Sequence, residues 1–260
     1  MKNSPIGVFD SGIGGLTVLE KMYELMPNEE YIYLADHANC PYGVKKEEEI
    51  RKIVVNNVKY LESLGVKCIV VACNTASLFI DDMQKNVKIP VISVIEPTCK
   101  KACNESKNGK IAVIATQMTI KNKKYQLYIE NENKLSFGVA CSEFVDFIEN
   151  DFEDFIKGQT LVNEKISCLK ETGIDTLIHG CTHFSLLEDK IRKVLGDINY
   201  VDCGTPTSIY LKELLEEKGL LTDKKEGKIK IYTTGKLKDL NKNINLFNIS
   251  YEKLEEIKNR

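Results

Sequence analysis

Two cysteines, Cys73 and Cys181, stand at equivalent places in the sequence and carry a side chain that can move a proton. Each follows an apolar stretch with the pattern of a β-strand and precedes the next turn or helix. Unpaired backbone N–H groups and the helix dipole stabilise a thiolate at such a place, so we expect them to lower the thiol pKa from about 8.5. One cysteine in this position is more often structural than catalytic, but a repeated pair favours catalysis.

Two thiols on opposite sides of one small substrate suit a particular reaction. A thiolate removes the proton from a carbon atom on one face, and a thiol returns a proton on the other face. The configuration of that carbon is then inverted, which is racemisation or epimerisation and needs no metal or redox cofactor in principle. Because a proton α to a carboxylate is only weakly acidic, the site must also stabilise the carbanion by hydrogen bonds and exclude water.

Two carboxylates end neighbouring predicted strands. Asp10 closes the first strand and adjoins Ser11 and a glycine turn, and Asp36 closes the second. A carboxylate in such a position commonly caps a helix and has no further function. In a cleft beside Cys73, Asp10 would hold the ammonium group of a substrate or orient the thiol proton. The same alternatives apply to Asp36, so both are candidate catalytic residues.

A histidine stands next to the second cysteine. His183 lies two residues after Cys181, and Glu149 is a candidate for the carboxylate that orients its imidazole. A single histidine is usually a satisfied polar group, but its proximity to a candidate thiol favours an assisting role. Short hydrogen-bond donors that suit a substrate carboxylate adjoin both cysteines, namely Asn74, Thr75 and Thr182.

A zinc site is the first alternative to proton transfer by thiols. His179, Cys181 and His183 alternate along the sequence, and in an extended strand their side chains would share one face. The chain is expected to turn at Gly180, however, and no fourth ligand stands at a recognisable spacing. We therefore predict no metal.

A dinucleotide site is the second alternative. The segment Gly12-Ile13-Gly14-Gly15 follows a predicted strand, opens a helix and precedes an acid at the end of the next strand. The third glycine of the GxGxxG pattern would fall at Thr17, where the pattern fails. An NAD enzyme is therefore a weak alternative, and we predict no cofactor.

Composition excludes several classes of protein. The 260 residues include 36 Lys and Arg against 38 Asp and Glu, and a net charge of −2 gives no electrostatic footprint for a nucleic acid or an anionic membrane. The nine cysteines are an odd number and form no CxxC motif, which favours free thiols in a reducing compartment. No apolar run approaches the roughly 20 residues that cross a bilayer, and the N-terminus has no leader pattern, so we expect a cytoplasmic protein.

The elements that must position these residues are βα units. Short apolar runs alternate with stretches of helical period, which predicts an α/β fold with mostly parallel sheets. A segment at 100–110, rich in Lys, Asn and Ser, is expected to be a domain boundary or a solvated connection. The C-terminal stretch is expected to return to the first half as a strand and a weak helix. The predicted strands are 6–9, 31–35, 67–72, 91–95, 111–116, 135–140, the segment before Cys181, and 229–234.

The order of elements begins again near residue 111. Gly65 precedes Cys73 by the same spacing as Gly173 precedes Cys181. The repeat predicts two similar lobes, each a mostly parallel sheet flanked by helices, with the active site in the cleft between them at the strand ends. We expect the first lobe at 1–97 plus 208–260 and the second at 98–207.

Four segments together resemble the signature motifs of the cofactor-independent glutamate racemases, within the aspartate/glutamate racemase family. The resemblance extends from about residue 6 to about residue 210. It implies two α/β lobes around an interlobe site, independence from pyridoxal phosphate, and an isomerase that supplies D-glutamate for bacterial peptidoglycan. In order and at the family's separations, the segments are Asp10-Ser11-Gly12-Ile13-Gly14-Gly15-Leu16, Pro41-Tyr42-Gly43, Cys73-Asn74-Thr75-Ala76 and Gly180-Cys181-Thr182-His183-Phe184.

The resemblance also implies a role for each candidate residue. Cys73 and Cys181 would be the two bases, one for each enantiomer of glutamate. Asp10 and His183 would assist them, and Glu149 would support the histidine. The residues that would surround the amino acid and its carboxylates are Ser11, Tyr42, Gly43, Asn74, Thr75, Thr116, Thr119 and Thr182, together with Asp10 and His183.

Three positions in the second half depart from the family's pattern. Ser142, His179 and Ser185 stand where a proline, an apolar residue and a proline are more usual. They leave the chemistry intact and bear on the fine contacts with the substrate.

Two alternatives remain after the resemblance. An aspartate or other amino-acid racemase would use the same chemistry, because one carbon of side-chain length depends on details of the pocket. A two-lobe amino-acid binding protein would use the hydroxyls and amides but has no need of two thiols. A homodimer is the assembly that we consider for this protein.

Overall fold

The computed structural model describes residues 1–257, apart from the side chains at positions 239, 242 and 243. The chain divides into two compact units. Unit 1 comprises 1–94 and the chain from 204 onward, and unit 2 comprises Ile95–Cys203. Each change of unit coincides with the start of a helix, α5 (Ile95–Glu105) and α11 (Gly204–Glu217). The predicted boundaries, after residues 97 and 207, lie near the starts of these helices.

Unit 1 is built on a six-stranded sheet in the order β10-β9-β2-β1-β3-β4, and all of its strand pairs are parallel. Every residue of its three central strands, β1, β2 and β3, is buried, as expected for a parallel sheet that is covered on both faces. The strands are β1 (Ile6–Asp10), β2 (Tyr31–Ala35), β3 (Cys68–Val71), β4 (Val91–Ser93), β9 (Ile229–Thr233) and β10 (Lys253–Glu256).

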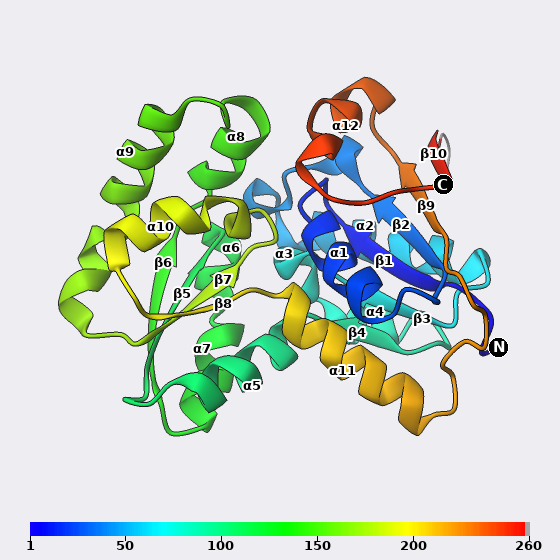
Figure 1. The fold of residues 1–260 in the computed structure, drawn as a ribbon, viewed down its shortest axis with the longest axis horizontal. Coiled ribbons are helices and arrows are strands. Elements are labelled where there is room, and N and C mark those ends of the chain that lie inside the picture. Colours follow the sequence, from blue (N-terminus) through cyan, green and yellow to red (C-terminus); the bar gives the residue numbers. More distant parts are fainter. Residues whose placement is uncertain (258–260) are drawn as a thin grey trace. The chain divides into compact units, whose positions relative to one another are not determined.

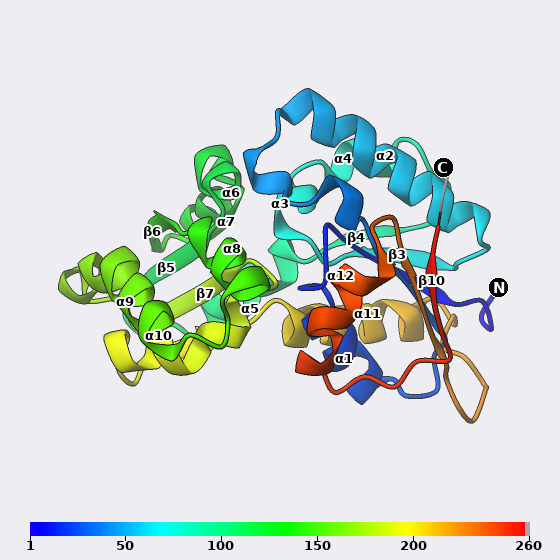
Figure 2. The ribbon, with the colours of Figure 1, turned by 90° about the horizontal axis from the view of Figure 1, so that it is seen from above.

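Helices cover both faces of this sheet. Figure 2 shows α2 and α4 on one face and α1 with α11 on the other. The helix α2 buries an apolar stripe, Ile50, Val54, Val58 and Leu61, at the helical spacing read from the sequence. The helices of unit 1 besides α11 are α1 (Leu16–Leu25), α2 (Glu47–Ser63), α3 (Asn74–Ser77), α4 (Ile80–Gln84) and α12 (Leu237–Asn243).

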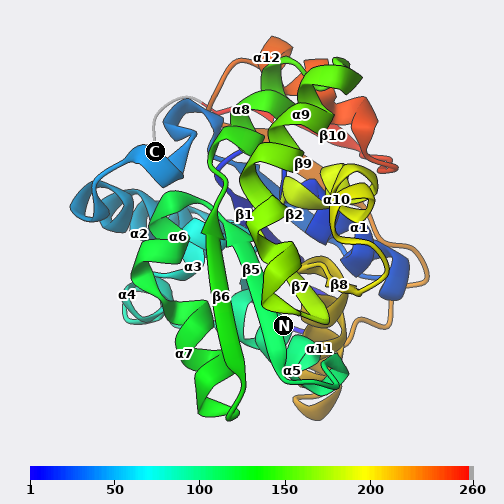
Figure 3. The ribbon, with the colours of Figure 1, turned by 90° about the vertical axis from the view of Figure 1, so that its left-hand side faces the viewer.

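Unit 2 is built on a four-stranded parallel sheet in the order β6-β5-β7-β8, which Figure 3 shows side by side. The helices α6 and α7 lie on one face of the sheet, and α9 and α10 lie on the other (Figure 2). The strands are β5 (Lys110–Ala115), β6 (Leu135–Ala140), β7 (Thr176–Gly180) and β8 (Asn199–Val201), and the helices besides α5 are α6 (Gln117–Asn122), α7 (Lys124–Asn131), α8 (Glu143–Asn150), α9 (Phe155–Ile166) and α10 (Glu188–Leu195).

The two units repeat one topology. The order β2-β1-β3-β4 in unit 1 corresponds, strand for strand, to β6-β5-β7-β8 in unit 2, and β9 with β10 extends only the first sheet (Figure 1). This confirms the predicted fold class, two α/β lobes that each contain a parallel sheet flanked by helices. The predicted connection at 100–110 is wrong for its first half, because α5 continues to Glu105. Cys99, Ala102 and Cys103 lie buried at helical spacing on α5, a periodicity that the lysines and asparagines obscured.

The C-terminal part of the chain is attached to unit 1 by more than strand pairing. Lys67 Nζ lies 2.5 Å from Glu29 Oε2, and it also donates to the carbonyl oxygens of Lys2 and Leu220 at 2.8 Å. The backbone N–H of Thr222 donates to Glu29 Oε1. Both charged side chains are almost fully buried, so their mutual pairing offsets the cost of removing them from water. The segment that leads from α11 to β9 is therefore held against the first part of the chain.

No helix in the described part of the chain is both long enough and apolar enough to span a membrane.

Candidate active site

The carboxyl ends of two paired strands bring three of the predicted residues together in unit 1. The strand β1 ends at Asp10 and pairs with β3, after which Cys73 precedes α3. The Sγ atom of Cys73 lies 3.6 Å from Oγ of Ser11. Parallel strands end at the same edge of a sheet, so residues 62 positions apart in the chain become neighbours. The two residues after Cys73, Asn74 and Thr75, are buried in the first turn of α3.

The environment of the Cys73 thiol has the opposite effect on its pKa from the one predicted. Burial, and after it the nearby carboxylate of Asp10, raises the pKa of this thiol to about 12. Hydrogen bonds from the backbone N–H groups of Ala76 and Ser11 and from the Ser11 hydroxyl lower it but do not compensate. The prediction of a depressed pKa is therefore wrong for Cys73, because loss of water around a thiolate outweighs the donors at the helix start.

Asp10 is held by the glycine turn that follows it. Its side chain accepts a hydrogen bond from the N–H of Gly12 at 2.9 Å, and it is fully buried. A Cβ atom on Gly15 would lie 2.5 Å from Cβ of Asp10 and 2.7 Å from the hydroxyl of Tyr33, so only glycine allows this close approach. The N-cap position of α1 is Gly15, five residues after Asp10. Asp10 is therefore not the N-cap residue of that helix.

Asp36 anchors the loop that carries Tyr42 and Gly43. The hydroxyl of Tyr42 donates to Asp36 Oδ2 at 2.5 Å, and burial together with the Asp36 carboxylate raises the pKa of Tyr42 well above its usual value. Asp36 also accepts hydrogen bonds from Asn39, Asn57 and Thr234. A buried carboxylate with this many donors favours a role in holding the loop over proton transfer. A catalytic role for Asp36 stays a prediction.

In unit 2, the structure links three predicted residues in a row. Cys181 directly follows β7, and its Sγ lies 3.9 Å from Nδ1 of His183. The Nε2 atom of His183 lies 3.1 Å from Oε1 of Glu149, near the end of α8. A neutral imidazole that donates its Nε2–H to Glu149 presents the Nδ1 lone pair to the thiol of Cys181. This order of thiol, imidazole and carboxylate suits transfer of a proton to and from Cys181.

Two hydroxyl residues close the neighbouring strand of unit 2. Thr116 follows β5, which pairs with β7, and its Oγ1 accepts a hydrogen bond from the N–H of Thr119 at the start of α6. The two hydroxyl oxygens lie 3.0 Å apart. Thr116, Thr119 and Thr182 are all buried, which is where hydroxyl groups that recognise a ligand are most effective.

Two of the departures from the family's pattern make local hydrogen bonds in unit 2. The Oγ atom of Ser142 accepts from the N–H of Gln117 at 2.9 Å and so ties the start of α8 to the start of α6. The hydroxyl of Ser185 donates to the carbonyl oxygen of Thr182 at 3.3 Å. Each serine therefore supports a turn next to a predicted binding residue.

The third departure, His179, lies apart from the Cys181–His183 contact. Its ring packs against Tyr200, with the ring centroids 6.1 Å apart, and its Nδ1 lies 4.0 Å from Oε2 of Glu188. Both ring nitrogens are buried without a hydrogen-bond partner in the structure. Among the residues that the structure describes, no group of three or more His, Cys, Asp or Glu side chains is placed to hold a metal ion.

His179 makes stability depend on pH. Burial lowers its pKa and outweighs the neighbouring carboxylates of Glu188 and Asp202, which raise it, while Arg192 lowers it further. In the unfolded chain the imidazole takes up a proton near pH 6.5, whereas in the folded protein it stays neutral to lower pH. The free energy of unfolding should therefore fall as the pH falls below about 6.5, by at most about 1.4 kcal/mol per pH unit for this one group.

The substitution His179→Leu tests this dependence. The free energy of unfolding is measured with urea at pH 8 and at pH 5.5. The difference between the variant and the wild type should shift in favour of the variant at the lower pH. Values at pH 8, where the imidazole is neutral in both states, are the control. Parallel pH profiles for the two proteins would contradict the assignment.

The structure adds two residues to the site that the sequence did not indicate, Asn57 and Thr234. Asn57 is a polar residue on the otherwise apolar face of α2, and that irregularity was a usable signal. Thr234 had no such signal, because it stands 198 positions from Asp36 in the chain.

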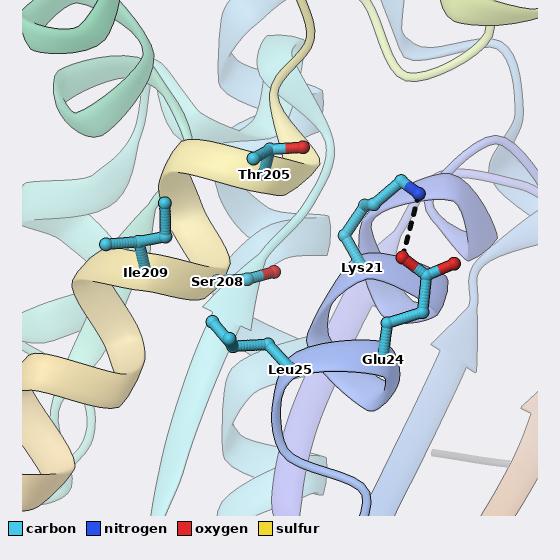
Figure 4. Close-up of a pocket in the computed structure, with 6 residues that line it drawn as sticks. All are labelled: Lys21, Glu24, Leu25, Thr205, Ser208 and Ile209. Carbon is cyan, nitrogen blue, oxygen red and sulfur yellow. Dashed lines mark hydrogen bonds and ion pairs between the residues drawn. The ribbon is translucent and has the colours of Figure 1, made fainter.

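One cavity of unit 1 lies away from these residues. It has a volume of about 340 Å³ and lies between α1 and α11. Figure 4 shows its lining residues, which include an ion pair between Lys21 and Glu24 at 2.8 Å. None of the predicted site residues lines it.

Comparisons with known proteins agree with the motifs. Residues 6–206 match the family model described as Asp/Glu/Hydantoin racemase. A glutamate racemase of Clostridium botulinum (strain Alaska E43 / Type E3) is 42% identical over 236 residues, which cover 88% of this chain and 91% of that protein.

Solved structures agree as well. A glutamate racemase isoform from Bacillus anthracis has a TM-score of 0.95 at 34% identity. The match covers 99% of this chain and 98% of that protein. A glutamate racemase from Francisella tularensis, solved with D-glutamate, has a TM-score of 0.93 at 33% identity with the same coverage. These likenesses confirm the resemblance stated from four motifs: the chain belongs to the Asp/Glu/Hydantoin racemase family.

Proposed function

We propose that this protein racemises glutamate without a cofactor and that the D-glutamate it makes in the cytoplasm supplies peptidoglycan synthesis. The observation that carries the proposal is the repeated arrangement of two thiols. Each unit has one of these cysteines within two residues of the end of an inner strand, and each cysteine has a polar partner, Ser11 for Cys73 and His183 for Cys181. The relatives named glutamate racemase support the choice of substrate.

In the proposed mechanism, Cys73 and Cys181 act on opposite faces of the α-carbon of one glutamate. One thiolate takes the α-proton, and the electron pair left on the carbon is stabilised by hydrogen bonds to the substrate carboxylate. The other thiol gives its proton to the opposite face, so that a C–H bond breaks on one side and another forms on the other. The enzyme ends with the two cysteines in exchanged protonation states, and proton exchange with water resets them.

The raised pKa of Cys73 requires help from the substrate in this mechanism. The carboxylate of Asp10 is one cause of the rise, and glutamate carries an ammonium group next to the reacting carbon. An ammonium group bound beside Asp10 offsets that negative charge, while the N–H groups of Ser11 and Ala76 continue to favour the thiolate. Binding of the substrate would then favour deprotonation of the thiol that attacks it.

Cys181 exchanges its proton by a different route. The imidazole of His183 lies next to the thiol, and Glu149 accepts the hydrogen bond from the far side of the ring. A carboxylate in that position holds the ring in one orientation, with Nδ1 toward the thiol. The two units share a topology but would form their thiolates in different ways. Cys73 would depend on Asp10 and the substrate ammonium group, and Cys181 on His183 and Glu149.

The carboxylates of glutamate would be held by buried hydroxyl groups and by N–H groups at the starts of α3 and α6. Such helix starts present unpaired donors and favour negative charge. The residues proposed for this role are Ser11, Tyr42, Gly43, Asn74, Thr75, Thr116, Thr119 and Thr182. A homodimer is the assembly that we propose for this protein.

The test is to incubate the protein with L-glutamate in D₂O and no added cofactor. The circular dichroism signal of the amino acid should decay to zero while deuterium enters the α-carbon, and a chelator should change neither rate. L-aspartate is incubated under the same conditions. Loss of its circular dichroism signal, with L-glutamate unchanged, would identify an aspartate racemase. If both amino acids keep their signal and their α-hydrogen, the protein is a binding protein and the proposal is wrong.

A further inference from the structure

The loop that carries Tyr42 and Gly43 is held by side chains from outside the four motifs. Tyr42 lies in a short 3-10 turn, Tyr42–Val44, between β2 and α2. Its hydroxyl donates to Asp36, and the carboxylate of Asp36 receives further hydrogen bonds from Asn57 on α2 and from Thr234 after β9. The position of the loop thus depends on the helix that follows it and on a residue after β9 that is distant in the sequence.

Asn57 bridges the two groups that define the loop. Its Nδ2 lies 3.0 Å from the hydroxyl oxygen of Tyr42 and 3.2 Å from Oδ2 of Asp36. The residue is only 2% exposed and stands among the apolar side chains of α2. A buried amide costs free energy unless it is hydrogen-bonded, so its presence on this face is explained by the pair that it contacts.

Thr234 makes an equivalent bridge from the opposite side. Its hydroxyl donates to Oδ1 of Asp36 at 2.8 Å and accepts from the N–H of Ala38 at 3.0 Å. The parallel register of β2 and β9 pairs Ala35 with Thr233, which sets Thr234 beside Asp36. Thr234 also lies beyond residues 6–206, the part that the family model matches.

We infer that Thr234 and Asn57 are positioning residues for the substrate, which act through Asp36 on the loop Tyr42–Val44. Each supplies one donor to a fully buried carboxylate, so removing either leaves its charge less compensated and frees the carboxylate to turn away from Tyr42. The returning C-terminal strand β9 is then a working part of the substrate site in unit 1. The inference rests on the proposed function for the role of Tyr42 and Gly43.

The first experiment measures steady-state racemisation by Thr234→Val, which keeps the shape and removes the hydroxyl. The KM for both enantiomers of glutamate should rise about tenfold, the effect of one lost hydrogen bond to a charged group, with a much smaller change in kcat. Asn57→Leu should act in the same direction, and Thr234→Ser should restore the KM. An unchanged KM in Thr234→Val and Asn57→Leu would overturn the inference.

Thr176→Val is the matched control. Thr176 is a fully buried threonine at the start of β7 in unit 2, and its hydroxyl also contacts an aspartate, Oδ1 of Asp175, at 3.0 Å. This variant loses a comparable hydrogen bond in the other unit, so its KM should stay at the wild-type value. An equal rise of KM in Thr176→Val would show a general loss of stability and would also overturn the inference.

A second readout separates this inference from the proposed function. In Thr234→Val the backbone amides from Ala38 to Lys45 should exchange with deuterium several-fold faster than in the wild type, because Ala38 loses its acceptor. This measurement needs no activity. If the wild type does not racemise glutamate, the proposed function fails, and unchanged exchange in this segment would separately refute the positioning role.

Discussion

Alanine in place of either Cys73 or Cys181 is expected to lower kcat/KM for glutamate racemisation by about a thousandfold, because each variant lacks one of the two groups that we propose to move the proton. General acid–base groups contribute roughly 10²- to 10⁴-fold, and no other side chain at the carboxyl ends of β3 and β7 carries a thiol in the described chain. The loss in kcat/KM must be equal for L- and D-glutamate. The two enantiomers have the same free energy in water, so the equilibrium constant is one for every variant.

Hydrogen exchange shows which thiol remains. In D₂O, each variant retains one base, which can remove the α-proton of one enantiomer and return deuterium to the same face. Cys73→Ala should therefore exchange the α-hydrogen of one enantiomer with retention of configuration, and Cys181→Ala that of the other. Mass spectrometry and chiral chromatography of the recovered amino acid measure both properties.

Cys141→Ala is the matched control for this experiment. Cys141 is fully buried and follows β6 as Cys181 follows β7, but no predicted site residue contacts its sulfur in the hydrogen bonds that the structure records. Its racemisation rate should stay near the wild-type value. Full interconversion by either Cys73→Ala or Cys181→Ala would refute the two-base mechanism.

The second large effect is expected at the pair of His183 and Glu149. The substitution His183→Asn removes the imidazole that we propose to exchange a proton with Cys181, and kcat should fall about a hundredfold. Glu149→Gln keeps an oxygen that accepts from Nε2 but loses the charge, so its kcat should fall less, about tenfold. Primary isotope effects with α-deuterated glutamate should rise in the direction in which Cys181 removes the proton.

His179→Leu provides the comparison for these variants. His179 is as deeply buried as His183 and lies equally close to Cys181 in sequence, but its contacts are with Tyr200 and Glu188. Its kcat at pH 8 should match the wild-type value. A loss of kcat in His179→Leu as large as in His183→Asn would contradict the assigned roles, because it would show that any buried imidazole beside β7 supports activity.

Local patterns in the sequence were sufficient for the thiols and for the strands other than β8 and β10, which were not predicted. Runs of buried residues such as those of β1 and β3 can be recognised from composition alone, because a parallel sheet that is covered on both faces needs apolar side chains throughout. The glycine turn after Asp10 and the cysteine after β3 follow directly from those strands. The repeat of that order in the second half predicted two similar lobes, and the structure gives them corresponding strand orders, β2-β1-β3-β4 and β6-β5-β7-β8.

Electrostatics could not be predicted in the same way. A position at the start of a helix indicates a low thiol pKa, but the pKa of Cys73 is raised because burial and the Asp10 carboxylate act more strongly than local N–H groups. Burial depends on every element packed around the thiol. The prediction failed because it used only the neighbours along the chain.

The sequence by itself therefore determined the family, most of the strands and the two candidate bases, since each depends on residues that are close in the chain. The tertiary structure alone decided what surrounds them. Asp36 is held by Asn57 and Thr234, one 21 and the other 198 positions further along the chain, and strand pairing between β2 and β9 brings Thr234 to it. A hydrogen bond depends on distance in space, and sequence separation carries no information about that distance until the fold is known.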